Sequence, residues 1–375
     1  MNLKNNLKVA IVYDRVTKFG GAERVLLALH EIFPNAPLYT SIYNNKKARW
    51  ASVFPKIYTS FLQNIPILKN YHELLGWLMP MAFEQFKFDE YNLVISVTSE
   101  AAKGIITGTN TKHVCYMLTP TRYLWSGYNF YLNNRPQVFK IFPLYKILAY
   151  PFLTYLKWWD RVASNRPDKI IAISNEVKNR IKKYYNRESV IVFPPVTLQN
   201  NFEKQNEETS KQKKGEYYFI HGRFEPYKKL DLVLDVFKKN NLQLIVSGSG
   251  SEFERLKTDN YKNIKFIYKP TDNELAGLYK NSKAFLMPQE EDFGITSLEA
   301  QSFGIPVIAY GKGGSLDTVV NNKTGLFFED QTCESLNSTI AKFDKIKFNK
   351  QYLMTNTKRF SFENFKRELL LELEK

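Results

Sequence analysis

The sequence predicts an α/β fold with two Rossmann-like, doubly wound domains. Short β-branched runs at residues 8–13, 92–97 and 169–173 alternate with helical patterns in the first half of the 375 residues. Such runs are typical of parallel strands that helices cover on both faces. The same alternation begins again at Tyr217. Residues 199–216 between the halves are polar and nearly free of large apolar side chains, as expected of a linker.

The predicted organisation has four parts, since the chain is long enough for two domains with separate cores. An N-terminal Rossmann-like domain covers residues 1–198. The linker, 199–216, leads to a second Rossmann-like domain at 217–354. Residues 355–375, rich in Leu, Glu and Lys, are expected to form a C-terminal helix that packs back towards the N-terminal domain.

The first half opens with the pattern of a βαβ unit. Strand 8–13 is followed by Gly20-Gly21 and by a helix at 24–33. A glycine pair there lets a phosphate or sugar come close to the backbone, although glycine is common in βα turns generally. The other elements expected in this half are strands at 37–43, near 56–57, and at 92–97, 113–118, 169–173 and 189–193, and a helix at 175–185.

The second half repeats the strand–helix order from Tyr217 onwards. Residues 322–326, NKTGL, predict a hairpin because Asn and Gly favour tight turns. The other elements expected in this half are strands at 217–222, 242–248, 264–268 and 307–310, and helices at 230–239, 252–257, 272–279, 296–303, 315–320 and 363–374.

Composition narrows the functional classes. The first residues, MNLKNNLKVAIVYD, enter a strand directly and lack the apolar core of a signal peptide. The longest apolar run, 74–83, is too short to span a membrane. Two cysteines, Cys115 and Cys333, supply neither a disulfide framework nor a metal cluster. We therefore expect a cytoplasmic protein that has no metal site and no cofactor.

The formal net charge of +16 favours an anionic partner, either nucleic acid or an anionic membrane surface. A lysine-rich surface without such a partner is also consistent with it. Residues 131–161 favour the membrane, because nine aromatic and five basic residues accompany one acid, Asp160. Helices that lie in a membrane interface have this composition. The open alternative is a helical excursion that packs on its own domain.

The most informative stretch is 286–310, LMPQEEDFGITSLEAQSFGIPVIAY, which has the pattern strand, loop, helix, strand. Glu291 precedes the predicted helix and Glu299 lies inside it. Gly294 between them lets the backbone approach a ligand closely, and the N–H groups at the helix start attract an anion. The stretch therefore predicts a phosphate site between two hydroxyl-binding carboxylates.

Positive charge for that phosphate follows the first strand of the second half. Residues 221–229, HGRFEPYKK, place Arg223 and Lys228 at the carboxyl edge of the predicted sheet, where ligands of α/β folds bind. The guanidinium fork matches phosphate oxygens and the ammonium adds a point charge. Taken alone, two solvated basic residues in a loop are an equally good interpretation. Together with Gly294 and its helix, they predict a diphosphate site.

These motifs resemble the retaining glycosyltransferases of family 4, which have the GT-B fold. Residues 290–314 resemble the family signature, in which Phe-Gly follows the first of two Glu residues and seven residues separate the two. Residues 221–237 resemble the diphosphate-binding turn, and 20–26, GGAERVL, the N-terminal glycine loop. The resemblance covers almost the whole chain. It implies two Rossmann-like domains that face each other across a cleft, with the acceptor bound by 1–198 and the nucleotide sugar by 217–354.

The resemblance also implies roles for individual residues. The implied catalytic residues are Glu291, Arg223 and Lys228. The implied donor-binding residues are Glu299, Phe293, Gly294, Ile295, Thr296 and Gly222. Glu299 would bind the ribose and Glu291 the transferred sugar. The acceptor and diphosphate loop would contain Gly20, Gly21 and Arg122.

The family's chemistry is transfer with retention of anomeric configuration. It implies front-face attack, in which the leaving diphosphate helps to deprotonate the acceptor. The substrate is a nucleotide sugar with GDP or UDP. Because the chain contains no Asp-x-Asp sequence, we expect the basic side chains, and not a metal ion, to neutralise the diphosphate.

Two stretches resemble the branch that contains bacterial O-antigen and capsule mannosyltransferases, namely 115–125, CYMLTPTRYLW, and 159–174, WDRVASNRPDKIIAIS. The branch implies GDP-mannose as donor and a lipid-linked or cell-surface saccharide as acceptor, with the enzyme peripheral on the inner face of the membrane. Relatives often have His where this chain has Leu118, so a UDP-sugar stays open. His113, on a predicted strand, is expected to be structural.

Two other classes of protein fit parts of the sequence. A nucleic-acid-binding protein fits the charge, but the sequence has no recognisable basic helix, aromatic single-strand platform or zinc module, so no nucleic-acid partner is expected. A nicotinamide-dependent dehydrogenase fits the glycine turns. However, Gly20-Gly21 lacks the three-glycine fingerprint and an evident acidic partner about 20 residues further on.

Overall fold

The computed structural model describes residues 7–65, 76–133, 145–196, 215–257 and 261–375. It divides into two units, which are described separately below. Unit 1 comprises Met1–Pro194 and Phe365–Lys375, and unit 2 comprises Pro195–Asn364. Most of the predicted linker and residues 134–144 of the predicted membrane segment lie outside the described residues.

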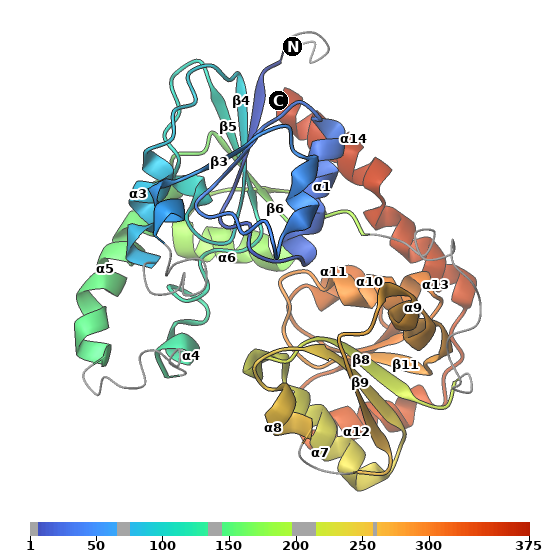
Figure 1. Cartoon of the computed structure of the whole chain (residues 1–375). Coiled ribbons are helices and arrows are strands. Elements are labelled where there is room, and N and C mark those ends of the chain that lie inside the picture. Colours follow the sequence, from blue (N-terminus) through green and yellow to red (C-terminus); the bar gives the residue numbers. More distant parts are fainter. Residues whose placement is uncertain (1–6, 66–75, 134–144, 197–214, 258–260) are drawn as a thin grey trace. The chain divides into compact units, whose positions relative to one another are not determined.

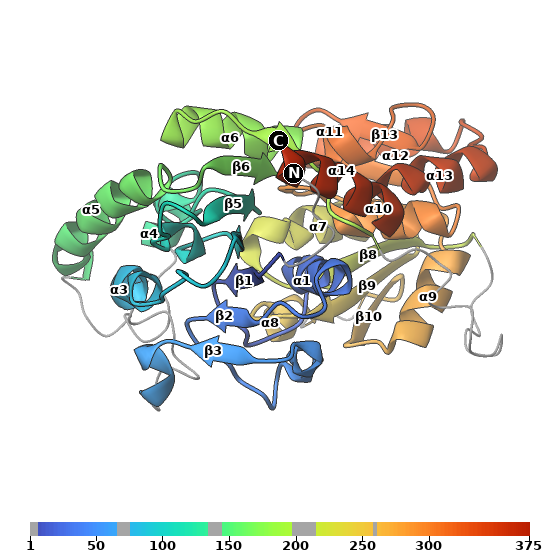
Figure 2. The ribbon, with the colours of Figure 1, turned by 90° about the horizontal axis from the view of Figure 1, so that it is seen from above.

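Unit 1 contains a parallel sheet with the order β3-β2-β1-β4-β5-β6-β7. Figure 2 shows β1, β2 and β3 as neighbours. Its strands are apolar throughout or nearly so, because helices cover both faces. They are β1 (Val9–Tyr13), β2 (Leu38–Thr40), β3 (Ile57–Thr59), β4 (Leu93–Thr98), β5 (Lys112–Met117), β6 (Lys169–Ala172) and β7 (Val190–Ile191).

The helices of unit 1 bury apolar stripes against this sheet. Beside the sheet, α5 and α3 are neighbours in both views (Figures 1 and 2), and Trp159 and Ala163 of α5 join a core cluster with Phe83 of α3. The helices are α1 (Gly21–Ile32), α3 (Met79–Glu84), α4 (Tyr128–Asn133), α5 (Tyr145–Ala163) and α6 (Asn175–Tyr185).

The C-terminal helix α14 (Phe362–Glu374) begins in unit 2 and continues into unit 1. Lys112 of β5 donates a hydrogen bond from Nζ to the Leu373 carbonyl at 2.9 Å. The ring of Phe365 packs edge-on against Tyr116 of the same strand, with 5.9 Å between centroids. Residues 365–375 therefore pack on the sheet of unit 1.

Unit 2 contains a second parallel sheet, with the order β10-β9-β8-β11-β12-β13. Two apolar clusters lie on its faces. One contains α7 and α12 side chains and the other α9 and α10 side chains. The strands are β8 (Tyr218–Arg223), β9 (Leu244–Ser249), β10 (Ile264–Tyr268), β11 (Ala284–Met287), β12 (Val307–Tyr310) and β13 (Gly325–Phe328).

Three helices of unit 2, α9, α12 and α13, begin at residues whose side chains cap them. Thr271 and Glu274 form a reciprocal capping box on α9. This motif provides acceptors for two backbone N–H groups that have no partner within the helix. The helices are α7 (Leu230–Asn240), α8 (Phe253–Lys257), α9 (Asp272–Asn281), α10 (Ile295–Ser302), α11 (Ser315–Thr318), α12 (Cys333–Phe343) and α13 (Lys350–Thr357). The sequence pattern did not predict α12 or α13.

The two Rossmann-like sheets confirm the predicted fold class, whereas a cleft between them stays a prediction. The hairpin expected at 322–326 is wrong. After a turn closed by the Thr324 N–H on the Val320 carbonyl at 2.8 Å, β13 pairs in parallel with β12. Asn and Gly there do make a turn, but it leads to the next parallel strand and not to an antiparallel partner.

Candidate functional site

The predicted phosphate site lies at the switch point of the sheet in unit 2. Strands β8 and β11 are neighbours there, and the strand order runs outwards from them in both directions. Ligands of such sheets bind outside the carboxyl ends of the strands at this point. Arg223 is the last residue of β8, and β11 ends at Met287, four residues before Glu291. The fold therefore brings both predicted loops to one edge.

At the end of β8, the backbone lies so close to the neighbouring strand β9 that there is little room for a side chain between them. Gly222 has φ of 157°, and Gly248 of β9 lies opposite it with φ of 140°. A Cβ at Gly248 would lie 1.8 Å from the Gly222 carbonyl oxygen, whereas one at Gly222 would meet nothing within 4 Å. Two glycines are required here because other residues rarely adopt these backbone angles. The outer side of Gly222 is thus open to a ligand.

The predicted catalytic residues Lys228 and Glu291 form an ion pair across the switch point. Nζ of Lys228 contacts Oε1 of Glu291, and Nε2 of Gln289 donates to the same oxygen at 2.6 Å. The two charged side chains are 16% and 15% exposed, so a ligand at the edge of the sheet can reach them. Arg223 is exposed, and its Nη2 donates to the Tyr227 hydroxyl at 3.0 Å.

The start of α10 has the geometry of an anion site. Gly294, its N-cap, has φ of 95°, a left-handed conformation in which glycine is strongly favoured. Without a side chain, Gly294 offers no cap to the first N–H groups of the helix. Ile295 and Thr296 in the first turn are half-buried. Phe293 is buried, and its ring packs edge-on against Phe360 at 5.6 Å between centroids.

The side chain of Glu299 is buried, unlike a carboxylate that binds a ligand at the protein surface. It is 5% exposed, and its Oε2 accepts a hydrogen bond from the buried Tyr279 hydroxyl at 3.0 Å. It is thus fixed in position by a neighbouring helix. Its role on the ribose stays a prediction.

The predicted acceptor residues Gly20, Gly21 and Arg122 all belong to unit 1. Gly20 is the N-cap of α1 in an extended conformation with φ of −175°, so backbone strain does not require glycine there. A Cβ at Gly20 would lie 3.2 Å from Oε2 of Glu23. Arg122 is half-buried in the turn after β5, where its carbonyl accepts the Gly127 N–H at 2.8 Å. The acceptor role of these residues stays a prediction.

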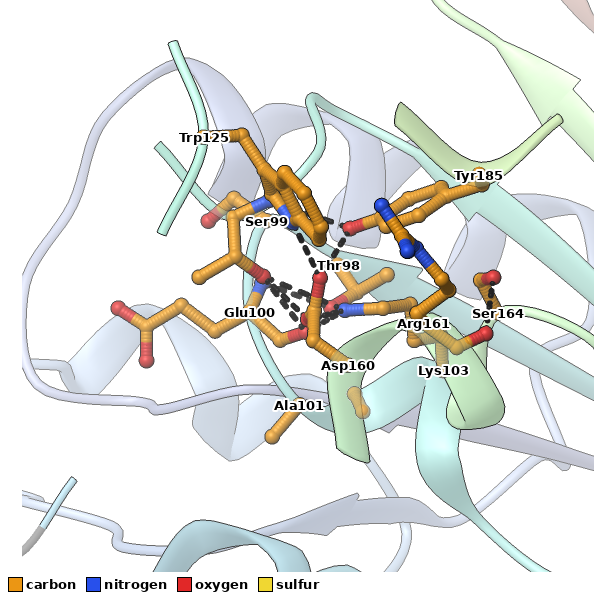
Figure 3. Close-up of polar contacts among 12 residues, drawn as sticks. Thr98, Ser99, Glu100, Ala101, Lys103, Trp125, Asp160, Arg161, Ser164 and Tyr185 are labelled. Carbon is orange, nitrogen blue, oxygen red and sulfur yellow. Dashed lines mark hydrogen bonds and ion pairs between the residues drawn. The ribbon is translucent and has the colours of Figure 1, made fainter. Parts of the chain in front are cut away.

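A buried network in unit 1 was missed from the sequence. Figure 3 shows Asp160 at its centre. The carboxylate accepts from Lys103 at 2.5 Å and from Thr121, Trp125 and Tyr185 at 2.7 Å each. It ties α5 and α6 to the turn that carries Arg122. One feature of the sequence could have indicated this network, because Asp160 is the single acidic residue of 131–161.

His113 is structural, as expected from the sequence. It is fully buried in the sheet, and its Nε2 shares a hydrogen bond of 2.8 Å with Oγ of Ser96 on the neighbouring strand. Burial lowers the pKa of His113 to about 3, and the charge of Arg166 adds to this effect. The imidazole is therefore neutral at physiological pH. Leu118 follows the end of β5 and is half-buried.

Two further properties concern the part of the chain that the structure describes. In that part, no group of three or more His, Cys, Asp or Glu side chains is arranged to hold a metal ion. None of its helices is both long and apolar enough to cross a membrane.

Comparison with known proteins agrees with the fold. Residues 201–359 match the family model described as "Glycosyl transferases group 1". The curated "Alpha-1,3/1,6-mannosyltransferase ALG2" of Dictyostelium discoideum is 23% identical over 98% of this chain and 97% of that protein. An "Uncharacterized glycosyltransferase" of Methanocaldococcus jannaschii is 22% identical over 55% of this chain. The chain spans 58% of the length of that relative.

A solved structure of Anabaena HepE in complex with UDP and glucose has a TM-score of 0.66 at 16% identity and covers 98% of this chain and all of its own. At this identity the likeness shows the fold alone, which is GT-B across the whole chain.

Proposed function

We propose that this chain is a retaining glycosyltransferase that moves a hexose from a nucleotide sugar to a lipid-linked or cell-surface polysaccharide intermediate. The observation that carries the proposal is the Lys228–Glu291 pair at the switch point of unit 2. Mannose from GDP-mannose is the first candidate, because the relative aligned over nearly the whole chain is named a mannosyltransferase. A UDP-sugar is the second, because the HepE structure is a complex with UDP.

The chemistry follows from the charges at this edge of the sheet. When the nucleoside diphosphate departs, negative charge develops on the β-phosphate. Arg223, Lys228 and the N–H groups of Ile295 and Thr296 meet that charge without rearrangement, which lowers the barrier. The positive side chains take the role that a metal ion has in other transferases, and no cofactor takes part.

Glu291 and Glu299 bind hydroxyl groups in this mechanism. Glu291 accepts from the transferred sugar while Lys228 orients the carboxylate. Glu299, held by Tyr279, accepts from the ribose. The acceptor attacks from the face that the diphosphate leaves, and a diphosphate oxygen takes the acceptor's proton. The configuration at the anomeric carbon is thereby retained.

Single substitutions test this site. Arg223→Ala and Glu291→Ala are each expected to slow turnover of the donor by about 10²–10³-fold, roughly 3–4 kcal/mol in the barrier. Arg255→Ala is the matched control, because it removes a guanidinium from an exposed pair with Asp231 in the same unit. The measurement is release of nucleoside diphosphate from GDP-mannose and from UDP-glucose. Wild-type rates in both site variants would show that the assignment is wrong.

Ligand-dependent melting separates the classes of protein. A ligand that binds only the folded chain raises its melting temperature. GDP or UDP is expected to do so, whereas NAD and a single-stranded oligonucleotide are not. Stabilisation by the oligonucleotide alone would favour the distant alternative, a non-enzymatic nucleic-acid-binding protein.

The proposal places the enzyme in the cytoplasm at an anionic membrane surface, with α5 as the contact. Leu156, Trp159 and Ala163 of α5 are buried, so part of the helix packs on its own unit, as the alternative interpretation held. The opposite stripe is aromatic. Tyr150 is 66% exposed and Trp158 62%, with Arg161 exposed beside them. Aromatic and basic side chains together suit the headgroup region of a bilayer.

Vesicle sedimentation tests the membrane contact. At low salt, the chain is expected to pellet with vesicles of phosphatidylglycerol and phosphatidylcholine, and less so at high salt. The double variant Tyr150→Ser/Trp158→Ser is expected to stay in the supernatant. Tyr268→Ser, which removes a 53% exposed aromatic from unit 2, is the control. A wild-type chain that does not pellet at low salt would contradict the proposal.

A further inference from the structure

A second charged pair lies at the switch point of unit 1. Strands β1 and β4 are neighbours there, and the chain continues outwards on either side of them. Arg15 is the second residue after β1, and Glu100 is the second after β4. They form an ion pair between Nη2 and Oε1. This is where a sheet of this type binds ligands, and none of the predicted site residues lies in the pair.

The backbone beneath the pair is fixed by a buried carboxylate. Asp14, directly after β1, accepts a hydrogen bond from Oγ1 of Thr98 at 2.8 Å. It also accepts from the backbone N–H groups of the next four residues, Ser99 to Ala102, at 2.7–3.1 Å. These bonds hold the turn after β4 against the end of β1. Arg15 and Glu100 therefore project from a rigid base.

The Glu100 side chain is separate from the buried Asp160 network. Lys103 contacts the backbone carbonyl of Glu100 and the carboxylate of Asp160. In Figure 3 the Glu100 carboxylate points away from Asp160. Arg15 pairs directly with that carboxylate. The two side chains are 18% and 17% exposed, which shields them from bulk water but leaves them within reach of a ligand.

Partial burial of the pair strengthens any hydrogen bond made there. Burial raises the pKa of the Glu100 carboxyl, although the charge of Arg15 opposes this effect. Burial raises the pKa of the Tyr123 phenol in the turn after β5. The charge of Glu100 adds to this effect and the charge of Arg15 opposes it. A carboxylate in such a partly desolvated site forms strong hydrogen bonds with donors that approach it.

The charge balance of the site selects a neutral ligand. A free anion would be repelled by Glu100, and a free cation by Arg15. The backbone N–H groups that would bind a phosphate are already taken by Asp14. A guanidinium beside a carboxylate instead matches a molecule with a donor and an acceptor on adjacent atoms. Two neighbouring hydroxyl groups of a sugar have this arrangement.

We propose that Arg15 and Glu100 form a sugar subsite in unit 1 that binds a vicinal pair of hydroxyl groups on the acceptor saccharide. Glu100 accepts a hydrogen bond from one hydroxyl, and Arg15 donates to the oxygen of the next. The inference rests on the proposed function, because it assigns the acceptor to these two residues.

The test measures binding of simple glycosides to the full chain. The probes are the methyl glycosides of mannose, glucose, galactose and N-acetylglucosamine, followed by saturation-transfer NMR. Glu100→Gln and Arg15→Met are expected to weaken binding of the best probe at least tenfold. Glu100→Asp and Arg15→Lys, which keep the charges, serve if those variants do not fold. Glu84→Gln is the control, because it breaks another partly buried pair of unit 1, with Arg166.

The monodeoxy analogues of the best probe refine the result. Removal of the hydroxyl that donates to Glu100 is expected to abolish the effect of Glu100→Gln, and removal of its neighbour the effect of Arg15→Met. Unchanged binding in the Arg15 and Glu100 variants would overturn the subsite, and so would a wild-type chain that binds none of the glycosides at 50 mM, a concentration roughly suited to weak sugar binding. The rise in melting temperature caused by GDP or UDP is measured on the same samples. A wild-type chain that neither nucleotide stabilises would count against the proposed function. Stabilisation by a nucleotide without glycoside binding would count against the subsite alone.

Discussion

The two switch points carry the same type of charged pair in different surroundings. Arg15–Glu100 in unit 1 and Lys228–Glu291 in unit 2 have nearly equal exposure. In unit 1, the adjacent backbone N–H groups are taken by the carboxylate of Asp14. In unit 2, the helix that follows starts at Gly294, which has no side chain to offer.

Under the two proposals above, this difference lets one fold bind two kinds of ligand. Backbone N–H groups at the end of a strand attract anions wherever they are left over. An internal carboxylate fills that position in unit 1, so the remaining pair suits an uncharged partner. The same position at the start of α10 is open to a phosphate, and Arg223 lies on the neighbouring strand. The predictions below test whether the two edges differ in this way.

The largest expected effect is on the network beneath the edge of unit 1. Lys103→Met leaves the Asp160 carboxylate without its cation where the two side chains are 1% and 2% exposed. We expect a loss of about 3–5 kcal/mol in unfolding free energy, measured by urea denaturation. Lys182→Met, which breaks an exposed pair with Glu188, should cost under about 1 kcal/mol. Equal stability of the two variants would show that the network does not support unit 1.

The next effect is on catalysis at the edge of unit 2. Lys228→Met removes the cation that contacts Glu291, so donor turnover should fall by about 10²–10³-fold, roughly 3–4 kcal/mol. Lys283→Met is the control, since Lys283 directly precedes β11 and pairs with Asp344 at the opposite end of that strand. Binding of methyl glycosides should be unchanged in both. If Lys228→Met weakened glycoside binding instead of turnover, the assignment of ligands to the two edges would be reversed.

A smaller effect is the loss of folding stability at acidic pH that His113 causes in unit 1. The folded-state pKa of His113 is lowered to about 3, whereas an unfolded histidine titrates near about 6.5. Between these values the unfolded chain binds a proton that the folded chain does not. Stability is therefore lost as pH falls below about 6.5, by roughly 2 kcal/mol at about pH 5. His113→Gln should flatten this dependence in urea titrations at several pH values. An unchanged slope would mean that His113 is protonated when folded.

The smallest effect concerns the ribose. Glu299→Gln keeps the shape of the side chain held by Tyr279 but removes its charge, so GDP or UDP should bind about tenfold more weakly, roughly 1.4 kcal/mol. The 2′-deoxy nucleotide is the control ligand. If Glu299 binds the ribose hydroxyls, the variant should discriminate less between UDP and dUDP than the wild-type chain does. Undiminished discrimination would leave Glu299 a purely structural group.

The sequence by itself determined the two parallel sheets, because apolar strand runs and helical patterns are local features that alternate along the chain. It also determined that Gly294 stands between Glu291 and Glu299, and that Arg223 and Lys228 share one turn. Each of these spacings lies within a single strand–turn–helix unit. Local geometry is sufficient to place such residues.

Only the tertiary structure decided which distant residues meet. Arg15 and Glu100 are 85 positions apart and Lys103 and Asp160 are 57 apart, and each pair depends on which strands become neighbours in the sheet. The burial of Glu299 against Tyr279, and the parallel pairing of β13 where a hairpin was expected, have the same origin. Strand order and register are set by the packing of whole elements. A residue pattern within one element cannot contain that information.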